Sequence, residues 1–277
     1  MTRTRLFTLI ALVSLFTSSF AGDEHAWHAH YLANAGVMIA RADTKILFDP
    51  FFRNDYGRYD LVPRETEAEV FAGSSPWDGV DAIFISHRHS DHFDPEAIRG
   101  FLHRWPDVRL YAPEQAAEAV LEVTETPGES LSNRVNGIKL EHDSPAVQLE
   151  MDGLVIEAVR VPHAGWPDRH ADVENIVFRV TLDEASTVMH LGDADAGSEH
   201  YTAHESHWQA RETDLAMVPV WLMLTDKGRY VLDEHIDAEH DIGVHVYKSI
   251  PDDPEDRPPE FDGLDLFTEP GEIRHFD

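Results

Sequence analysis

The segment ISHRHSDHFDPEAI, residues 85–98, places three histidines and two aspartates within the eight positions from His87 to Asp94. The apolar run VDAIFIS, residues 80–86, comes directly before the histidines and predicts a buried strand. Asp94 followed by Pro95 is typical of a helix start, with Asp94 as the N-cap. The metal-capable side chains therefore lie in a short loop between a buried strand and a capped helix, and such a scaffold can aim them rigidly.

The His-x-His-x-Asp-His spacing suits a pair of metal ions. In extended backbone His87 and His89 point the same way, because side chains alternate along a strand. Asp91 and His92 follow in the turn that leads into the helix. One loop thus offers two imidazoles to one ion, and a carboxylate with an imidazole to its neighbour. Zinc binds His nitrogen and Asp oxygen at about 2.0–2.2 Å, and catalytic zinc sites leave one position for water.

Composition limits the class of protein and the kind of site. The 277-residue chain has no cysteine, so any transition-metal site must use His, Asp and Glu. With 42% hydrophobic residues it can bury the core of one large layered domain. Its 52 acidic and 22 basic residues give a net charge of −30, which predicts a solvated, salt-tolerant surface. That charge argues against nucleic acid and anionic lipid surfaces as partners.

Residues 1–21 resemble a secretory signal peptide. Arg3 and Arg5 precede the apolar stretch LFTLIALVSLF, and the small residues Ser19 and Ala21 follow it. The apolar stretch is short for a membrane span, so an uncleaved anchor is the weaker alternative. No later stretch is apolar for long enough to cross a bilayer. We therefore expect cleavage and a periplasmic or secreted protein without a stable membrane span.

The rest of the chain divides into a main domain, residues 22–250, and an acidic, proline-rich tail, residues 251–277. Ten acidic residues and five prolines in the tail predict poor order or a strap over the surface, with little chemistry. In the main domain strands and helices alternate up to about residue 135, and strands dominate afterwards. The expected elements near the start are a strand at 28–40, a strand at 44–52 and a surface loop at 56–80.

The segment ISHRHSDH resembles the signature of the metallo-β-lactamase superfamily, whose members typically carry a binuclear metal site. Other stretches match the family in the same order. NAGVMIARADTKILFDPFF is similar to the opening hairpin of the branch with lactonase-like and phospholipase-D-like hydrolases, and the later matches are VPHAG, MHLGDAD, AMVPVW and DIGVHVY. The resemblance covers roughly residues 28–250. It implies an α/β fold, an αββα sandwich of two mixed sheets with outer helices and the metal site at one edge. The alternative is an ordinary layered α/β hydrolase with an unrelated metal loop.

The resemblance also implies a set of metal ligands. One ion would be held by His87, His89 and His163, the other by Asp91, His92 and His245, with Asp193 joining both. Three of these positions have rivals, which are His170 for His163, Asp195 for Asp193, and His235 or His240 for His245. Gly192 favours Asp193, because glycine permits close approach of the backbone.

The implied cofactors are two Zn²⁺ ions, with Mn²⁺ or Fe as alternatives. Such a pair makes a metal-bridging hydroxide that attacks an ester, lactone, amide or phosphodiester of a small-molecule or lipid-derived substrate. Asp193 would fix the metal spacing and Asp91 would orient the hydroxide, so both are candidate catalytic residues. A β-lactam hydrolase and a non-catalytic, metal-dependent binding protein of the same fold are the alternative functions.

The remaining histidines carry weaker expectations. The His-rich patches at residues 25–30 and 200–207 are expected to be solvated surface, although His28 or His30 could support the metal site. His190 is expected to pack inside the protein. Residues 221–240 follow no recognisable pattern, and we expect them to line the substrate pocket.

Overall fold

The computed structural model describes residues 26–123, 130–151 and 153–277. The predicted signal peptide, residues 1–21, lies outside the described residues, so its cleavage and the location of the protein stay predictions. Among the helices of the described ranges, none combines the length and the apolar character that a bilayer span needs.

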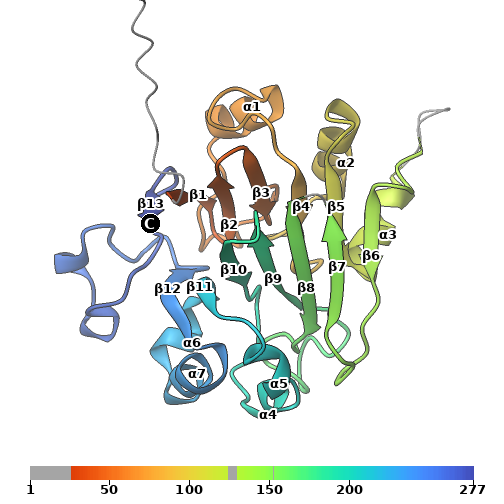
Figure 1. Cartoon of the computed structure of the whole chain (residues 1–277). Helices are drawn as coiled ribbons and strands as arrows, with labels where there is room; N and C mark the ends of the chain where they lie inside the picture. The colour runs from red at the N-terminus through yellow and green to blue at the C-terminus, as the bar shows by residue number, and fades with distance from the viewer. Residues whose placement is uncertain (1–25, 124–129, 152) are drawn as a thin grey trace, which may run out of the picture.

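Two mixed β-sheets pack face to face, with helices on both outer faces (Figure 1). In the described part of the chain the first sheet has the order β13-β1-β2-β3-β4-β5-β6, and the second has the order β12-β11-β10-β9-β8-β7. The strands of the first sheet are β1 (Trp27–Ala33), β2 (Gly36–Arg41), β3 (Thr44–Phe48), β4 (Ala82–Phe84), β5 (Arg109–Pro113), β6 (Val135–Ile138) and β13 (Ile273–Phe276). Those of the second are β7 (Val147–Met151), β8 (Leu154–Arg160), β9 (Ile176–Leu182), β10 (Ser186–His190), β11 (Thr213–Pro219) and β12 (Ala238–Val244). The predicted sandwich is confirmed.

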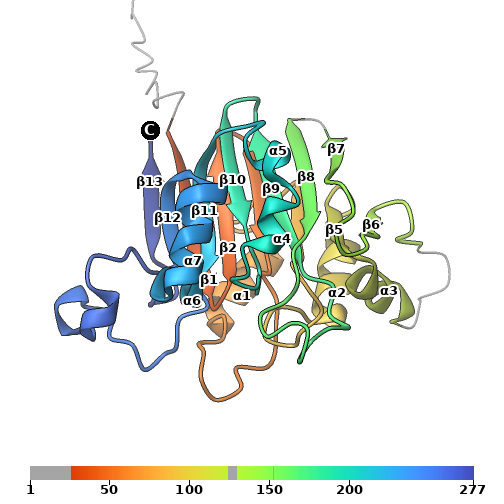
Figure 2. The same ribbon diagram turned by 90° about the horizontal axis from the view of Figure 1, so that it is seen from below.

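The helices form the two outer layers, as the view from below shows (Figure 2). The first sheet is covered by α1 (Arg64–Ala72), α2 (Pro95–Arg104) and α3 (Glu114–Glu122). The second is covered by α4 (Glu199–Thr202), α5 (Glu205–Trp208), α6 (Val220–Leu224) and α7 (Asp226–Val231). A π-helical turn (Leu232–Ile236) follows α7, and two 3₁₀ turns (Pro254–Asp256 and Pro259–Phe261) lie near the end of the chain.

The apolar run before the histidines is buried on both faces of its sheet. Ala82 and Phe84 of β4 join the core between the two sheets, whereas Ile83 and Ile85 join the core under the outer helices. This alternation follows from the two-residue period of a strand. A strand covered on both sides has no polar face, which explains why its sequence reads as continuously apolar.

Helix α2 begins where the sequence predicts. The Oδ1 atom of Asp94 accepts a hydrogen bond from the backbone N–H of Ala97 at 2.7 Å, and proline occupies the first helical position. Ile98, Phe101 and Leu102 are buried against the first sheet. The cap fixes the end of the His/Asp loop, because the helix cannot start earlier without losing this bond.

Two predictions near the start of the chain are wrong. Residues 28–40 form two strands and not one, because the chain reverses at Asn34, which adopts a left-handed φ of 51°. Residues 56–80 are not all loop, since they contain α1. Among the residues of α1 only Val70 is fully buried, so its apolar periodicity is too weak to indicate a helix.

The end of the chain lies inside the domain. Strand β13 pairs antiparallel with β1, and the ring of Phe276 stacks on Trp27 with centroids 4.3 Å apart. Phe267 is fully buried and stacks on Tyr31 at 4.8 Å. The structure thus builds residues 251–277 into the first sheet and the central core, whereas their composition suggests a tail outside the domain.

Candidate metal centre

All seven predicted ligands meet at one edge of the sandwich. They follow the ends of four strands, with His87, His89, Asp91 and His92 after β4, His163 after β8, Asp193 after β10 and His245 after β12. They form two groups, His87, His89, His163 and Asp193 in one and Asp91, His92 and His245 in the other. Within each group the candidate ligand atoms lie within 4.8 Å of one another. All are buried except His89, which is half-buried.

Asp193 connects the two groups through its two carboxylate oxygens. Its Oδ2 atom lies 3.2 Å from His163 Nε2 and 3.9 Å from His87 Nε2. Its Oδ1 atom lies 3.2 Å from His92 Nε2 and 3.5 Å from His245 Nε2. Each oxygen therefore faces a different set of imidazoles, which is the arrangement of a carboxylate between two cations.

The other distances within each group are of the same size. His87 Nε2 lies 3.1 Å from His89 Nδ1, and His245 Nε2 lies 3.2 Å from Asp91 Oδ2. Two ligand atoms about 2.1 Å from a shared tetrahedral ion lie about 3.4 Å apart. The spacing of these side chains therefore matches ligands of one ion in each group.

Unsatisfied polar atoms test whether a metal fits. The buried atoms His92 Nε2, His163 Nε2 and Asp193 Oδ1 have no hydrogen-bond partner among the described residues, although His92 Nε2 and Asp193 Oδ1 are only 3.2 Å apart. A buried polar atom left unpaired costs about 1–3 kcal/mol. One cation in each group would satisfy these atoms, with His163 Nε2 in the first and His92 Nε2 in the second, so the residues present fit divalent metal.

Asp49 orients ligands of both groups, and the sequence analysis missed its role. Its Oδ1 atom accepts a hydrogen bond from Ser86 N at 2.7 Å, and its Oδ2 atom lies 2.8 Å from His92 Nδ1. The Ser86 hydroxyl donates to Asp49 Oδ2 at 2.6 Å and lies 3.0 Å from His87 Nδ1. Outer groups of this kind fix the ring orientation of metal ligands. The available signal was the Asp-Pro-Phe turn directly after β3, in which Asp49 is fully buried.

The backbone at Asp193 is held by a close approach at Gly192. Asn175 Oδ1 accepts a hydrogen bond from Asp193 N at 3.0 Å. A Cβ atom at Gly192 would lie 2.4 Å from this same Oδ1 atom and 2.6 Å from Ser86 Cβ. Gly192 also has a left-handed φ of 56°. Only glycine permits both the close approach and the left-handed φ, which explains why a glycine precedes Asp193.

Backbone contacts hold the two later histidines. His163 forms an isolated β-bridge with Ala194, so the loops that carry His163 and Asp193 are joined. The backbone N–H of His245 donates to Asn34 O at 2.8 Å, and Asn34 Nδ2 donates to Asp91 O at 2.8 Å. The turn between β1 and β2 thus connects the His/Asp loop to the end of β12.

The rival ligands have other positions. His170 is exposed and packs on His163 with ring centroids 4.5 Å apart, outside both groups. Asp195 accepts hydrogen bonds from Gly165 N and Gly197 N at 2.9 Å each, so it organises a loop. The last pair of rivals points elsewhere, because His235 faces Glu205 at 2.8 Å and His240 is exposed at the edge of β12.

The remaining histidines differ in part from expectation. His30 packs on Trp77 and His28 on His275, so neither joins the centre. His190 is fully buried as predicted, with Nε2 2.9 Å from Ala35 O.

The expectation of a solvated surface at residues 200–207 is wrong for His200 and His204, which are both buried. Here α4 and α5 pack against the second sheet, and His200 lies against the ring of Trp166. Helices α4 and α5 have four residues each, which is too few to show the apolar periodicity that would indicate a buried face.

The charges at the centre favour a cation. Burial and the neighbouring imidazole of His163 lower the pKa of His89 to about 4. Burial alone would raise the pKa of Asp193, but the imidazoles of His245 and His92 hold it well below its usual range. Burial alone would lower the pKa of His92, yet the carboxylates of Asp193 and Asp91 raise it well above its usual range. The centre thus keeps ionised carboxylates beside the neutral imidazole of His89, whereas His92 carries a proton between two carboxylates, a positive charge that a metal ion would replace.

A cleft of about 490 Å³ opens onto the centre. Its walls include five of the seven ligands together with Tyr56, Arg58, Tyr59 and His170. No residue of 221–240 lines this cleft, contrary to expectation. Trp221 of that segment packs near the ligands, with its ring centroid 5.3 Å from that of His245. The loop before α1 forms the wall instead.

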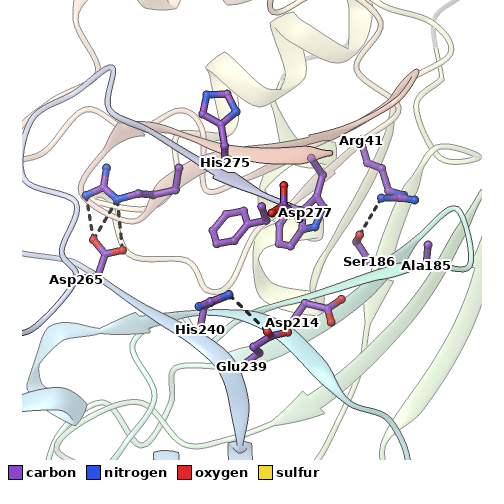
Figure 3. Close-up of a pocket in the computed structure, with 12 residues that line it drawn as sticks. Arg41, Ala185, Ser186, Asp214, Glu239, His240, Asp265, His275 and Asp277 are labelled. Atoms are coloured by element: carbon purple, nitrogen blue, oxygen red, sulfur yellow. Dashed lines mark hydrogen bonds and ion pairs between the residues drawn. The ribbon is translucent and has the colours of Figure 1, made fainter. Parts of the chain in front are cut away.

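A larger hollow of about 990 Å³ lies at the opposite ends of the strands (Figure 3). Ser186 at the start of β10 and His240 near the start of β12 line it, whereas Asp193 and His245 follow the other ends of these strands. Both acidic and basic side chains line it, among them the pair of Arg274 and Asp265 at 3.0 Å. None of the seven ligands reaches it, so size alone does not indicate the site of chemistry.

Comparisons with known proteins agree with this geometry. The family model described as a beta-lactamase superfamily domain matches residues 29–234. Igni18, a metallo hydrolase from Ignicoccus hospitalis, superposes with a TM-score of 0.59 at 14% identity, covering 91% of this chain and 99% of that chain. The isothiocyanate hydrolase from Delia radicum gut bacteria gives 0.61 at 15% identity, covering 90% and 99%. At these identities the likeness shows the fold alone.

Curated relatives match over shorter lengths. The UPF0173 protein YddR of Bacillus subtilis is 28% identical over 93 residues, which cover 28% of this chain and 36% of the relative. The chain spans about a third of the length of the curated relatives it matches, 36% and 29%. The family match, in contrast, extends over well more than half of the 277 residues. The fold, the two His/Asp groups and this match lead to one conclusion, that the chain belongs to the beta-lactamase superfamily and has the metallo-β-lactamase fold of metal-dependent hydrolases.

Proposed function

We propose that this chain is a hydrolase that uses two divalent metal ions to cleave an ester, lactone or phosphodiester in a small-molecule or lipid-derived substrate. The observation that supports the proposal most is the position of Asp193, whose two oxygens face separate sets of imidazoles. His87, His89 and His163 would hold one ion, and Asp91, His92 and His245 the other.

A bound divalent pair would lower the pKa of water and polarise the carbonyl or phosphoryl oxygen under attack. The protein's own contribution is to position the groups around the reaction. Asn175 fixes the backbone of Asp193, and the backbone carbonyl of Asp91 is held by Asn34. The ring of Tyr59 packs edge-on against His245 at 4.2 Å and lines the same cleft. The 490 Å³ cleft is large enough for a small molecule.

Zinc is the first candidate for both ions, because it binds imidazole and carboxylate together in open catalytic sites. Manganese and iron are the alternatives, since a set of five histidines and two aspartates accepts all three. Metal analysis of the purified protein should give two ions per chain.

The His89→Ala variant tests the proposal against a matched control, His240→Ala, which removes an exposed histidine outside both groups. Both variants and the parent are loaded with zinc and assayed on a panel of phenyl esters, lactones and bis(4-nitrophenyl) phosphate. We expect His89→Ala to lose bound metal and hydrolysis while its circular dichroism is retained, and His240→Ala to keep all three. Two bound ions without turnover of any substrate would instead indicate a binding protein. Antibiotic susceptibility of an expressing strain distinguishes the β-lactam alternative.

Export is part of the same proposal and rests on residues 1–21 alone. Fractionation of cells that express the full chain tests it, since a cleaved protein in the periplasm or medium is expected. A full-length product that stays in the cytoplasm or the membrane would contradict it.

A further inference from the structure

Arg58 lies in the wall of the cleft that opens onto the metal centre, and it is the only lysine or arginine in that wall. Its guanidinium has no hydrogen bond or ion pair with any other residue in the described ranges. Its basic neighbours differ in this respect, because Lys248 pairs with Asp55 at 3.1 Å and Arg53 pairs with Glu67 at 2.6 Å. In a chain with 52 acidic and 22 basic residues, an arginine without an acidic partner is available for a ligand.

The backbone around Arg58 is fixed on both sides. Its N–H donates to Asp55 O at 2.7 Å, and its carbonyl accepts from Lys248 N at 2.9 Å. Asn54 N donates to Ser90 O at 3.1 Å, which attaches the loop to the segment that carries His89 and Asp91. The turn itself depends on Gly57, which has a left-handed φ of 68°. Arg58 is thus held at a constant position relative to the ligands on either side.

Aromatic side chains share the cleft wall with Arg58 or lie next to it, because Tyr56 and Tyr59 line the cleft and Tyr247 stacks on Tyr59. Tyr56 and Tyr247 are 54% and 44% exposed, two of the five large hydrophobic side chains exposed among the described residues. Tyr59 stacks on Tyr247 with centroids 5.4 Å apart, and the Tyr56 hydroxyl lies 3.3 Å from Ser90 Oγ. Exposed aromatic surface that clusters beside a polar site is typical of ligand contact. Beside the candidate ligands, the cleft wall therefore presents one guanidinium and two aromatic side chains, those of Tyr56 and Tyr59.

We propose that the substrate of this hydrolase carries a carboxylate or phosphate on an aromatic or apolar body, and that Arg58 binds this anion while Tyr56 and Tyr59 contact the body. The inference rests on the proposed function and adds the substrate class to it. The guanidinium can donate two parallel hydrogen bonds to such an anion. The net charge of −30 repels anions at long range. Beside the proposed metal ions, Arg58 is the lysine or arginine that the cleft wall offers to such an anion.

Matched substrates test this subsite during turnover. 4-Nitrophenyl butyrate and 4-nitrophenyl hemisuccinate share a leaving group, and only the second ends in a carboxylate. We expect the metal-loaded protein to show a KM about tenfold lower for the hemisuccinate at similar kcat. Arg58→Ala should abolish this preference and Arg58→Lys should restore part of it. Arg64→Ala, which removes an exposed arginine outside the cleft wall, should keep it. Loss of the preference in Arg64→Ala as well would contradict a specific role of Arg58.

Calorimetric binding of benzoate, phenylphosphonate and benzyl alcohol tests the subsite without turnover. Benzoate or phenylphosphonate should bind the metal-loaded protein about tenfold more tightly than Arg58→Ala, and rising salt should weaken this binding. Benzyl alcohol should not distinguish the two proteins, and the tighter of the two anions identifies the preferred group. Equal affinity of both anions for the parent and Arg58→Ala overturns the inference. Anion binding that depends on Arg58, in a protein that hydrolyses none of the panel, would refute the proposed function and leave the subsite intact.

Discussion

The carboxylate of Asp49 lies 2.8 Å from the Nδ1 atom of His92, and both side chains are fully buried. Neither Asp49 nor Ser86 belongs to the two ligand groups, yet together they contact the far nitrogens of His87 and His92. The residue after β3 therefore helps to aim two imidazoles in the loop that follows the next strand, β4. Ligand geometry here depends on a residue about forty positions earlier in the chain.

Replacing Asp49 by Asn should weaken metal binding by about 10- to 100-fold, because an amide neither charges nor orients His92 as a carboxylate does. Competition with a chromophoric chelator measures the affinity of each ion. Asp78→Asn, which alters an exposed aspartate paired with Lys45, is the control and should leave affinity unchanged. Unchanged affinity in Asp49→Asn would show that the buried contact does not tune the ligand.

Gly192→Ala should be strongly destabilising, by about 2–4 kcal/mol, because the new methyl group would collide with Asn175 and Ser86. Gly79→Ala is a matched control, since Gly79 also has a left-handed φ, 71°, but has nothing within 4 Å of the new Cβ atom. That control should cost only about 1–2 kcal/mol. Urea unfolding measures the loss of stability in both variants. The loss in Gly79→Ala reports backbone strain, and the extra loss in Gly192→Ala reports the collision. Equal losses in the free energy of unfolding would argue against a close approach at Gly192.

Phe267→Ala should destabilise the protein by about 3–5 kcal/mol, because the ring is fully buried between the sheets and stacks on Tyr31. Ile273→Ala removes a side chain that is 41% exposed on β13 and should change the free energy of unfolding little. Deleting residues 251–277 should prevent stable folding, as it removes β13 together with Phe267. A deletion variant with the thermal midpoint of the parent would show that the end of the chain is dispensable.

Asp241 should make stability depend on pH. Burial and the nearby Asp233 raise its pKa to about 6, and its Oδ1 atom has no hydrogen-bond partner among the described residues. The unfolded value is about 3.9, so the folded state binds more protons between about pH 4 and pH 6. Stability from this group is present below pH 4 and is lost as pH rises through 6.

Asp241→Asn stays uncharged and escapes this loss. From pH 4.5 to pH 7.5, the free energy of unfolding of the variant should therefore rise by about 1–3 kcal/mol relative to that of the parent. Urea unfolding of the variant and the parent at pH 4.5 and at pH 7.5 measures the difference in their free energies of unfolding. A difference that is the same at both pH values would mean that Asp241 titrates normally.

The sequence predicts both the sandwich, which the structure confirms, and a set of candidate ligands, which the structure brings together in two groups. The seven candidate ligands occur in segments with specific spacing, so His87 to His92 and Asp193 can be proposed from the sequence alone. The Asp-Pro-Phe turn marks Asp49, but neither its contact with His92 nor the place of Arg58 in the cleft follows from the sequence, because both depend on segments distant in the chain.

The same reason explains the errors at the two ends. The chain reversal at Asn34 depends on a left-handed conformation, which asparagine adopts more readily than most residues but which its presence alone does not predict. The role of residues 251–277 depends on pairing between β13 and β1, nearly the whole length of the chain apart. Their acidic, proline-rich composition concealed a few buried residues such as Phe267.

Anomalous X-ray scattering from crystals of the zinc-loaded protein, recorded on both sides of the zinc absorption edge, tests the central claim most directly. Two peaks are expected on opposite sides of the Asp193 carboxylate, each about 2.0–2.2 Å from its ligand atoms. One should contact His87, His89 and His163, and the other Asp91, His92 and His245. A single peak, or peaks bound by residues outside these two groups, would contradict a binuclear centre joined by Asp193.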